Sequence, residues 1–334
     1  AVSSAKKEYG EVSENYAIAC HNVAECYHEL NQWRNSTYYY FIAIKAYKKA
    51  RLVEDCNEVA LCSNALGIAY LELKKYDSAV YFLEKSFKYF SDNAIEEYDN
   101  ALVVMNTLIE IYSSDNKFDR WENVCIKMLP FIEKKEGKLS DNYVSIFSSA
   151  IFATRELEKY SSVEKLVKPY LPLLKTVLPK YKKEYGLLCY NLGFSLQQLE
   201  KYKDAIGYIK DAEIIYKEVN GKEINLDLAF YNNNLGVCYL REQQYDTAAN
   251  HFEIAFNYLI NDKANYPNLI IIASNLYLAY TNNERENKWK VALEKLLLVI
   301  EKNETVKSEN YCSYLAEYCL TLRKLSLYTE IEKL

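Results

Sequence analysis

The chain has 334 residues, and its 41 Lys and Arg against 46 Asp and Glu give a net charge of −5. This balance excludes a global electrostatic attraction for nucleic acid, so we expect no direct reading of DNA by these residues. Half of the residues are apolar, whereas only 8 are Gly and 5 are Pro. This composition predicts a folded chain dominated by helices.

The chain begins AVSSAKKEYG, which lacks the apolar segment of a signal peptide. Later apolar stretches, such as 269–273 and 296–300, are far shorter than a membrane span. We therefore expect a cytoplasmic protein with no membrane partner. Because the first residue is Ala, we also expect that an N-terminal part has been removed.

Self-similarity organises the chain from residue 15 onward. The segments LGIAYLELKKYDSAV (66–80), LGFSLQQLEKYKDAI (192–206) and LGVCYLREQQYDTAA (235–249) align without gaps. A fixed period of this kind predicts a solenoid of stacked units. Seven repeats cover about residues 15–305, and residues 306–334 are expected to cap the end. With the Gly position of each copy as an anchor, the anchors are Ala24, Gly67, Ile109, Ile151, Gly193, Gly236 and Tyr277.

The strong copies carry small residues at two fixed places. Their Gly falls inside a predicted helix, where Gly costs ~1 kcal/mol relative to Ala, so we expect close approach by a neighbouring helix. Twelve residues later stand Ala79, Ala205 and Ala248, the matching small residues of a second helix. Repeat four departs from this pattern, because Thr154 and Val163 replace the Tyr and the small residue.

These positions, L-G-x-x-Y followed by Y-D-x-A, are those of tetratricopeptide repeats, which this sequence resembles over most of its length. The resemblance implies an all-α, right-handed superhelical solenoid of about seven helix pairs in a single domain, 1–334. The first helix of each pair is then expected to line the concave side. The period of about 42 exceeds the 34 residues of the basic repeat, and longer helices are the simplest account.

The resemblance also implies which side chains face the concavity. The row three residues before the anchors is polar throughout, whereas the rows six before and one after are mostly apolar. Such a surface suits an extended peptide, because Asn donates and accepts hydrogen bonds at once. Arg155 and Arg241, about one turn after their anchors, are candidates to pair with a carboxylate. The predicted peptide-binding residues are Asn64, Asn106, Tyr190, Asn191, Asn233, Asn234, Asn275, Phe194, Phe230, Arg155 and Arg241.

A structural interpretation of the Asn residues stays open. Asn191, Asn234 and Asn275 stand two residues before their anchors, where Asn is common in the repeat itself. For Asn64, Asn106 and Asn233, a polar row is also what any solvated concave face requires.

A catalytic interpretation rests on a single group. His21, Glu25 and His28 share a helix face near the start of the chain, and they are candidates for a metal or acid–base cluster. Cys20 and Cys26 point elsewhere by helical angle, so a four-ligand zinc site does not close. With no phosphate-binding Gly loop and no nucleophile motif, we expect neither an enzyme nor a cofactor or metal. The nine cysteines contain no C-x-x-C pair and are expected to be reduced.

The last helical segment carries an apolar stripe that caps the solenoid or pairs with a second copy. A homodimer is therefore one expectation. The stripe consists of Tyr311, Tyr314, Leu315, Tyr318 and Leu322.

The repeat number, the period and the Asn-rich row resemble the peptide-receptor regulators of Gram-positive bacteria, the Rap, NprR, PlcR and PrgX group. The resemblance implies a cytoplasmic receptor that binds a short signalling peptide through Asn side chains and regulates transcription. Most members carry an N-terminal DNA-binding domain, and residues 1–15 are too few to form one, so DNA is expected as a partner only through a missing domain. The alternatives are a generic scaffold or co-chaperone-like module, and a Rap-like inhibitor of a response regulator.

Overall fold

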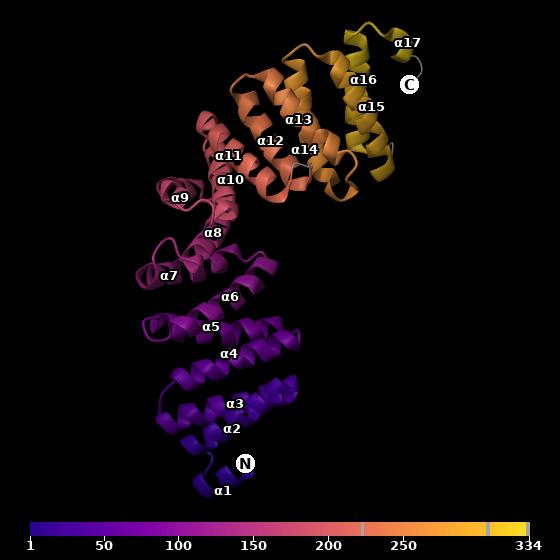
Figure 1. Cartoon of the computed structure of the whole chain (residues 1–334). Coiled ribbons are helices and arrows are strands. Elements are labelled where there is room, and N and C mark those ends of the chain that lie inside the picture. Colours follow the sequence, from indigo (N-terminus) through magenta and orange to yellow (C-terminus); the bar gives the residue numbers. More distant parts are fainter. Residues whose placement is uncertain (222–223, 305–307, 332–334) are drawn as a thin grey trace. The chain divides into compact units, whose positions relative to one another are not determined.

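A computed structural model describes residues 1–221, 224–304 and 308–331 of the chain. Within these ranges, every regular element is an α-helix except for one short 3-10 helix. The helices form two compact units, Ala1–Leu157 and Glu158–Leu334 (Figure 1). Whether they form one continuous domain with a right-handed superhelix stays a prediction.

Unit 1 is a succession of helices, each of which packs against the next along the chain (Figure 1). The longest have 19 residues, which accounts for the long period. The helices are α1 (Val2–Tyr9), α2 (Glu14–Glu29), α3 (Trp33–Arg51), α4 (Asn57–Glu72), α5 (Tyr76–Asp92), α6 (Tyr98–Ser114), α7 (Phe118–Glu136) and α8 (Asp141–Glu156).

Unit 2 repeats this arrangement, and its consecutive helices again pack in chain order. The predicted all-α repeat solenoid is thus confirmed in each unit. The elements are α9 (Tyr160–Lys175), α10 (Lys182–Gln198), α11 (Tyr202–Asn220), α12 (Leu226–Arg241), α13 (Tyr245–Leu259), η1 (Lys263–Asn265), α14 (Tyr266–Thr281), α15 (Glu286–Asn303), α16 (Glu309–Lys324) and α17 (Tyr328–Ile331).

The anchor glycines lie where a second helix approaches closely, as predicted. A Cβ added to Gly67 would stand 2.6 Å from Leu83 Cγ. One added to Gly236 would stand 2.6 Å from the Phe252 ring. At Gly193 the added carbon would also meet backbone, with the amide nitrogen of Ile209 at 3.1 Å. At these three anchors, close packing of the two helices of a pair therefore leaves no room for a side chain.

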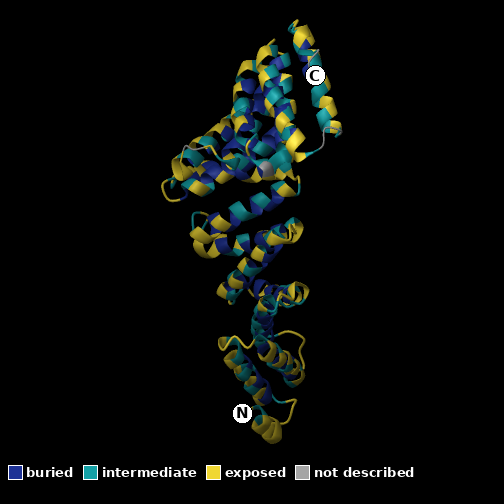
Figure 2. Cartoon of the chain, turned by 90° about the vertical axis from the view of Figure 1, so that its right-hand side faces the viewer, coloured by how far each residue is buried: buried dark blue, intermediate teal, exposed yellow. Residues whose placement is uncertain are grey.

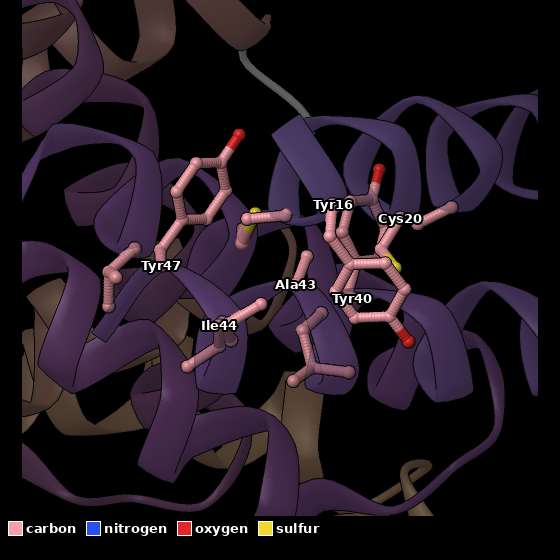
Figure 3. Close-up of a cluster of buried hydrophobic side chains, with 12 residues drawn as sticks. Tyr16, Cys20, Tyr40, Ala43, Ile44 and Tyr47 are labelled. Carbon is pink, nitrogen blue, oxygen red and sulfur yellow. The ribbon is translucent and has the colours of Figure 1, made fainter. Parts of the chain in front are cut away.

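The core of unit 1 begins with aromatic residues of α2 and α3. Tyr16 and Cys20 of α2 pack with Tyr40 and Tyr47 of α3, and all four are buried (Figure 3). The sides of the helices that meet their neighbours are buried, while the turns and outward sides are exposed (Figure 2). The many Tyr residues suit this thin core, because each adds a large apolar ring with a polar tip.

In repeat four, a buried polar contact takes the place of the usual Tyr. Thr154 is buried, and its hydroxyl donates to Oε1 of the buried Glu122 at 2.9 Å. The hydroxyl also lies 2.8 Å from the backbone oxygen of Ala150. Val163 is fully buried in α9 of unit 2. Thr154 thus replaces the usual Tyr with a buried hydrogen bond to a carboxylate.

Each first helix ends in the same left-handed turn, seven residues after the anchor. In repeat two, Lys74 has a φ of 57°, its N–H donates to the Leu71 oxygen, and the N–H of Lys75 donates to the Tyr70 oxygen. These bonds form a Schellman motif. The residues in this conformation at the ends of the first helices are Asn31, Lys74, Asn116, Glu158, Glu200, Gln243, Glu284 and Ser326, and none is Gly.

The last member of this series extends the repeat count. Ser326 stands seven residues after Cys319, which itself follows the anchor Tyr277 by 42 residues. Tyr328 then begins α17 at the position of the turn Tyr in the other repeats. Within 308–331, the predicted cap therefore has the register of an eighth repeat. The parts of the cap at 306–307 and 332–334 lie outside the described residues.

Replacing a left-handed residue by Gly is expected to stabilise the protein. A non-Gly residue in this conformation costs about 1–2 kcal/mol, partly offset by the greater freedom of Gly in the unfolded chain. We expect Glu200→Gly to raise the free energy of unfolding by about 0.5–1 kcal/mol, measured by urea denaturation. Lys165→Gly, at an exposed helical position of α9, is the control and should lower it by a similar amount. A loss of stability in Glu200→Gly would contradict the assignment.

A hydrogen-bonded cluster recurs in both units at positions 168 residues apart, which is four periods of 42. In each unit a Tyr hydroxyl and an Asn amide donate to the same Glu oxygen, joining three successive helices or their ends. In unit 1, Tyr98 Oη lies 2.6 Å from Glu136 Oε1 and Asn142 Nδ2 lies 2.9 Å from it. In unit 2 the equivalent distances, from Tyr266 and Asn310 to Glu304, are 2.7 and 2.8 Å.

Candidate functional site

A chain of side-chain hydrogen bonds crosses three first helices of unit 2. Asn234 Nδ2 of α12 donates to the hydroxyl of Tyr190 in α10 at 3.0 Å. Asn233 Nδ2 lies 3.5 Å from Asn234 Oδ1, at the outer limit of a hydrogen bond. Asn275 Nδ2 of α14 donates to Asn233 Oδ1 at 3.2 Å. We call Tyr190, Asn233, Asn234 and Asn275 the polar ladder.

The ladder keeps hydrogen-bonding capacity that it does not use internally. An amide nitrogen carries two hydrogens, and Asn233 and Asn275 each donate one of them within the ladder. No described residue donates to Asn275 Oδ1. Both side chains are half-buried, whereas Asn234 is buried. Asn233 and Asn275 are therefore the ladder members that a ligand can reach, and Asn234 supports them.

Apolar side chains flank the ladder on the same helix faces, because positions three or four apart lie on one side of a helix. Leu187, Ile271 and Leu278 are 41%, 56% and 46% exposed. Phe194, Phe230 and Val237 are half-buried. We call these six residues together with the polar ladder the first-helix face of unit 2. It combines reachable amides with apolar side chains that are only partly covered.

Aromatic rings close one end of the ladder. The Tyr190 ring lies 4.5 Å from the Tyr231 ring and 6.5 Å from the Phe194 ring, measured between centroids. Phe194 also packs edge-on against Tyr160 of α9. These contacts fix the Tyr190 hydroxyl as the partner of Asn234, since a packed ring has little rotational freedom.

The two predicted arginines lie in different surroundings. Arg241 is exposed at the end of α12 and makes no ion pair with the described residues. Arg155 belongs to unit 1, where its guanidinium pairs with Glu156 and lies 4.7 Å from the centre of the Phe152 ring. Arg241 is therefore the one with an uncompensated charge for a ligand carboxylate.

The other predicted residues are spread over both units. Asn64 is half-buried in unit 1 and its Oδ1 is buried without a hydrogen-bond partner among the described residues. Asn106 is exposed. Asn191 of unit 2 is buried, so it is not positioned for a ligand in this conformation. The row one residue after the anchors is apolar in unit 2. In unit 1 the same row includes the exposed Glu25 and Glu110.

The histidines near the start of the chain contact different partners. His21 Nε2 lies 3.3 Å from Glu25 Oε1. The His28 ring packs edge-on against Trp33, with centroids 4.9 Å apart. No group of three or more metal-ligating side chains comes together in the ranges that the structure describes.

The structure adds two polar contacts that the sequence reasoning missed. Ser274 Oγ of α14 lies 3.0 Å from the Tyr314 hydroxyl of α16, where burial raises the Tyr314 pKa. On the other side of α12, the buried Asn232 joins His251 of α13, with Nδ1 and Oδ1 2.8 Å apart. Burial lowers the pKa of His251 and favours its neutral form. The sequence signal for the second contact was the run of three Asn at 232–234. Successive residues of a helix point in different directions, so Asn232 does not lie on the first-helix face with Asn233.

Comparisons with known proteins bear on the fold. The chain is similar to the crystal structure of BtubC (BKLC) from P. vanneervenii, with 17% sequence identity and a TM-score of 0.50, over 66% of this chain and 89% of that one. The fold of each unit is that of an all-α repeat solenoid. No protein-family model and no curated protein matches it.

Other similar solved structures include two with a TM-score of 0.49. One is the Podosopora anserina putative kinesin light chain with nearly identical TPR-like repeats, at 12% identity over 62% of this chain and 97% of that one. The other is the apo form of RapI, at 12% identity over 95% of this chain and 89% of that one. Separately, none of the helices in the described residues has the length and apolar character needed to cross a membrane.

Proposed function

We propose that the first-helix face of unit 2 binds an extended peptide. The observation that carries this proposal is the polar ladder between two rows of partly exposed apolar side chains. An extended peptide presents N–H and C=O groups along its backbone and side chains to alternate sides. The free hydrogens of Asn233 and Asn275 suit backbone carbonyls, and Asn275 Oδ1 suits an N–H.

The apolar rows define the chemistry of that peptide. Leu187, Ile271 and Leu278 together leave apolar surface uncovered on one side of three helices. Covering such surface contributes roughly 25 cal/mol per Å², so the peptide is largely apolar. Arg241 stands at the end of α12 and receives an acidic side chain or the terminal carboxylate. Unit 1 is less suited, because Glu25 and Glu110 interrupt its equivalent row.

The wider role follows from the sequence resemblance. We propose that the chain is a cytoplasmic receptor for a short signalling peptide and a binding protein rather than an enzyme. Its response to the peptide would reach DNA only through a DNA-binding domain that residues 1–334 do not include, and would involve a homodimer. The support for this part is the Asn-rich row shared with peptide-receptor regulators.

Replacing Asn233 is expected to weaken peptide binding. A hexapeptide would first be selected on the protein from a random library, and its affinity measured by calorimetry. We expect Asn233→Ala to lower the affinity about five- to tenfold, as loss of one or two hydrogen bonds predicts. Asn250→Ala, at an exposed position of α13, is the control and should leave the affinity unchanged. Selection of no peptide, or equal affinity in both variants, would argue against the proposal.

A further inference from the structure

A pocket of about 270 Å³ opens beside the polar ladder, between α10, α11 and α12. Its apolar wall includes Leu187 of the first-helix face and Val219 near the end of α11. Both are large apolar side chains that remain more than 40% exposed. Tyr231, whose ring packs against Tyr190 of the ladder, also lines the pocket. The pocket is therefore adjacent to the surface proposed to bind the peptide.

Two aromatic rings that line this pocket contact each other. The Tyr216 and Tyr231 rings meet edge to face, with centroids 5.4 Å apart and planes at 90°. Tyr216 is held in place because its hydroxyl donates to Asp227 Oδ2 at 2.6 Å and accepts from Asn225 Nδ2 at 2.9 Å. Fixed rings of this kind favour a further aromatic group in offset or edge-to-face contact.

The size and charge of the pocket limit the kinds of group that fit it. Pockets for whole drug-sized ligands usually have about 300–1,000 Å³, so this pocket suits a single large side chain. Lys183 lies at the pocket and forms no ion pair with any described residue. An ammonium group attracts the face of an aromatic ring. Asp227 accepts the hydrogen bond of Tyr216 and keeps its negative charge, so the pocket carries one charge of each sign and Lys183 is the cation available to an aromatic ring.

We infer that this pocket accepts one aromatic side chain of the bound peptide and thereby sets the sequence preference at that position. The inference rests on the proposed function, since the peptide backbone is held by the neighbouring ladder. Leu187 belongs to both surfaces, so the residue that enters the pocket lies next to the segment held by Asn233.

Replacing an exposed residue of the pocket wall by a large side chain, which fills the pocket, tests the inference. A positional-scanning hexapeptide library would be bound to the wild type, to Val219→Trp and to Val291→Trp. Val291 is an exposed valine of α15 and serves as the matched control, and circular dichroism would check that all three proteins are folded. We expect the wild type and Val291→Trp to require Phe, Tyr or Trp at one position. Val219→Trp should lose at least tenfold in affinity for those peptides and prefer Ala or Ser there.

The outcomes separate the inference from the proposed function. If the wild type binds peptides and Val219→Trp keeps the same preference at every position, the pocket assignment is overturned and the peptide-binding face survives. If the wild type shows no aromatic requirement at any position, the assignment is likewise overturned. If the wild type binds no library peptide, both proposals fall together.

Discussion

Exchange of Gly193 for Ala is expected to lower the free energy of unfolding by about 1–3 kcal/mol, the usual cost of overpacking a core. Ala is the better helix former by ~1 kcal/mol, so helix propensity alone predicts the opposite sign. Packing decides the result, because the added Cβ would stand 2.6 Å from Ile209 Cγ1 and 3.3 Å from the Ala205 oxygen. To make room, α11 must move away from α10.

Gly207 offers the matched control within the same helix pair. It lies in α11, it is exposed, and a Cβ added there meets nothing within 4 Å. Gly207→Ala should therefore raise the free energy of unfolding by about 1 kcal/mol. Urea denaturation of both variants measures the two effects. If Gly193→Ala is as stable as Gly207→Ala, the close approach at the anchor is not what maintains the repeat.

Introducing a charge on the first-helix face is expected to weaken peptide binding strongly, with little effect on folding. Leu278 is 46% exposed and flanks the ladder on α14, so a glutamate is tolerated in the free protein. Binding of an apolar peptide would bury that carboxylate without a partner. We expect Leu278→Glu to weaken the selected hexapeptide at least tenfold, which is about 1.4 kcal/mol.

The control for this prediction is another exposed leucine of the same unit. Leu298 lies in α15, a second helix, and is 58% exposed. Leu298→Glu makes the same chemical change away from the ladder and should leave the affinity unchanged. Calorimetric titration of both variants with one peptide provides the comparison. Equal weakening in both variants would place the binding surface elsewhere or point to a nonspecific charge effect.

The helix pairs were predictable because their signals are local. A Gly inside a predicted helix indicates that another helix approaches closely. The structure confirms this close approach at Gly67, Gly193 and Gly236. The left-handed turns gave no such signal, since Glu200 and Lys74 occupy a conformation that usually selects Gly. The eighth repeat was hidden for a similar reason, because Cys319 and Leu322 replace the Gly and Tyr of the pattern.

The candidate site was predictable only as a set of positions. The tetratricopeptide resemblance placed Asn233 in the row expected to face the concavity, and it left a structural role open for Asn275, two residues before its anchor. The bond between Asn275 and Asn233 depends on how α12 and α14 rotate against each other, which a single sequence does not specify. The same holds for Asn234, whose partner Tyr190 is 44 residues away. The pocket beside Tyr216 and Tyr231 also requires three helices to be in place.

Photo-crosslinking tests the central claim, that the first-helix face of unit 2 binds an extended peptide. The selected hexapeptide would carry benzoylphenylalanine at successive positions, and mass spectrometry would identify the residues it joins. We predict crosslinks to α10, α12 and α14, at or next to Leu187, Asn233, Phe230, Asn275 and Leu278. Crosslinks confined to α11, α13 and α15, or to unit 1, would contradict the claim.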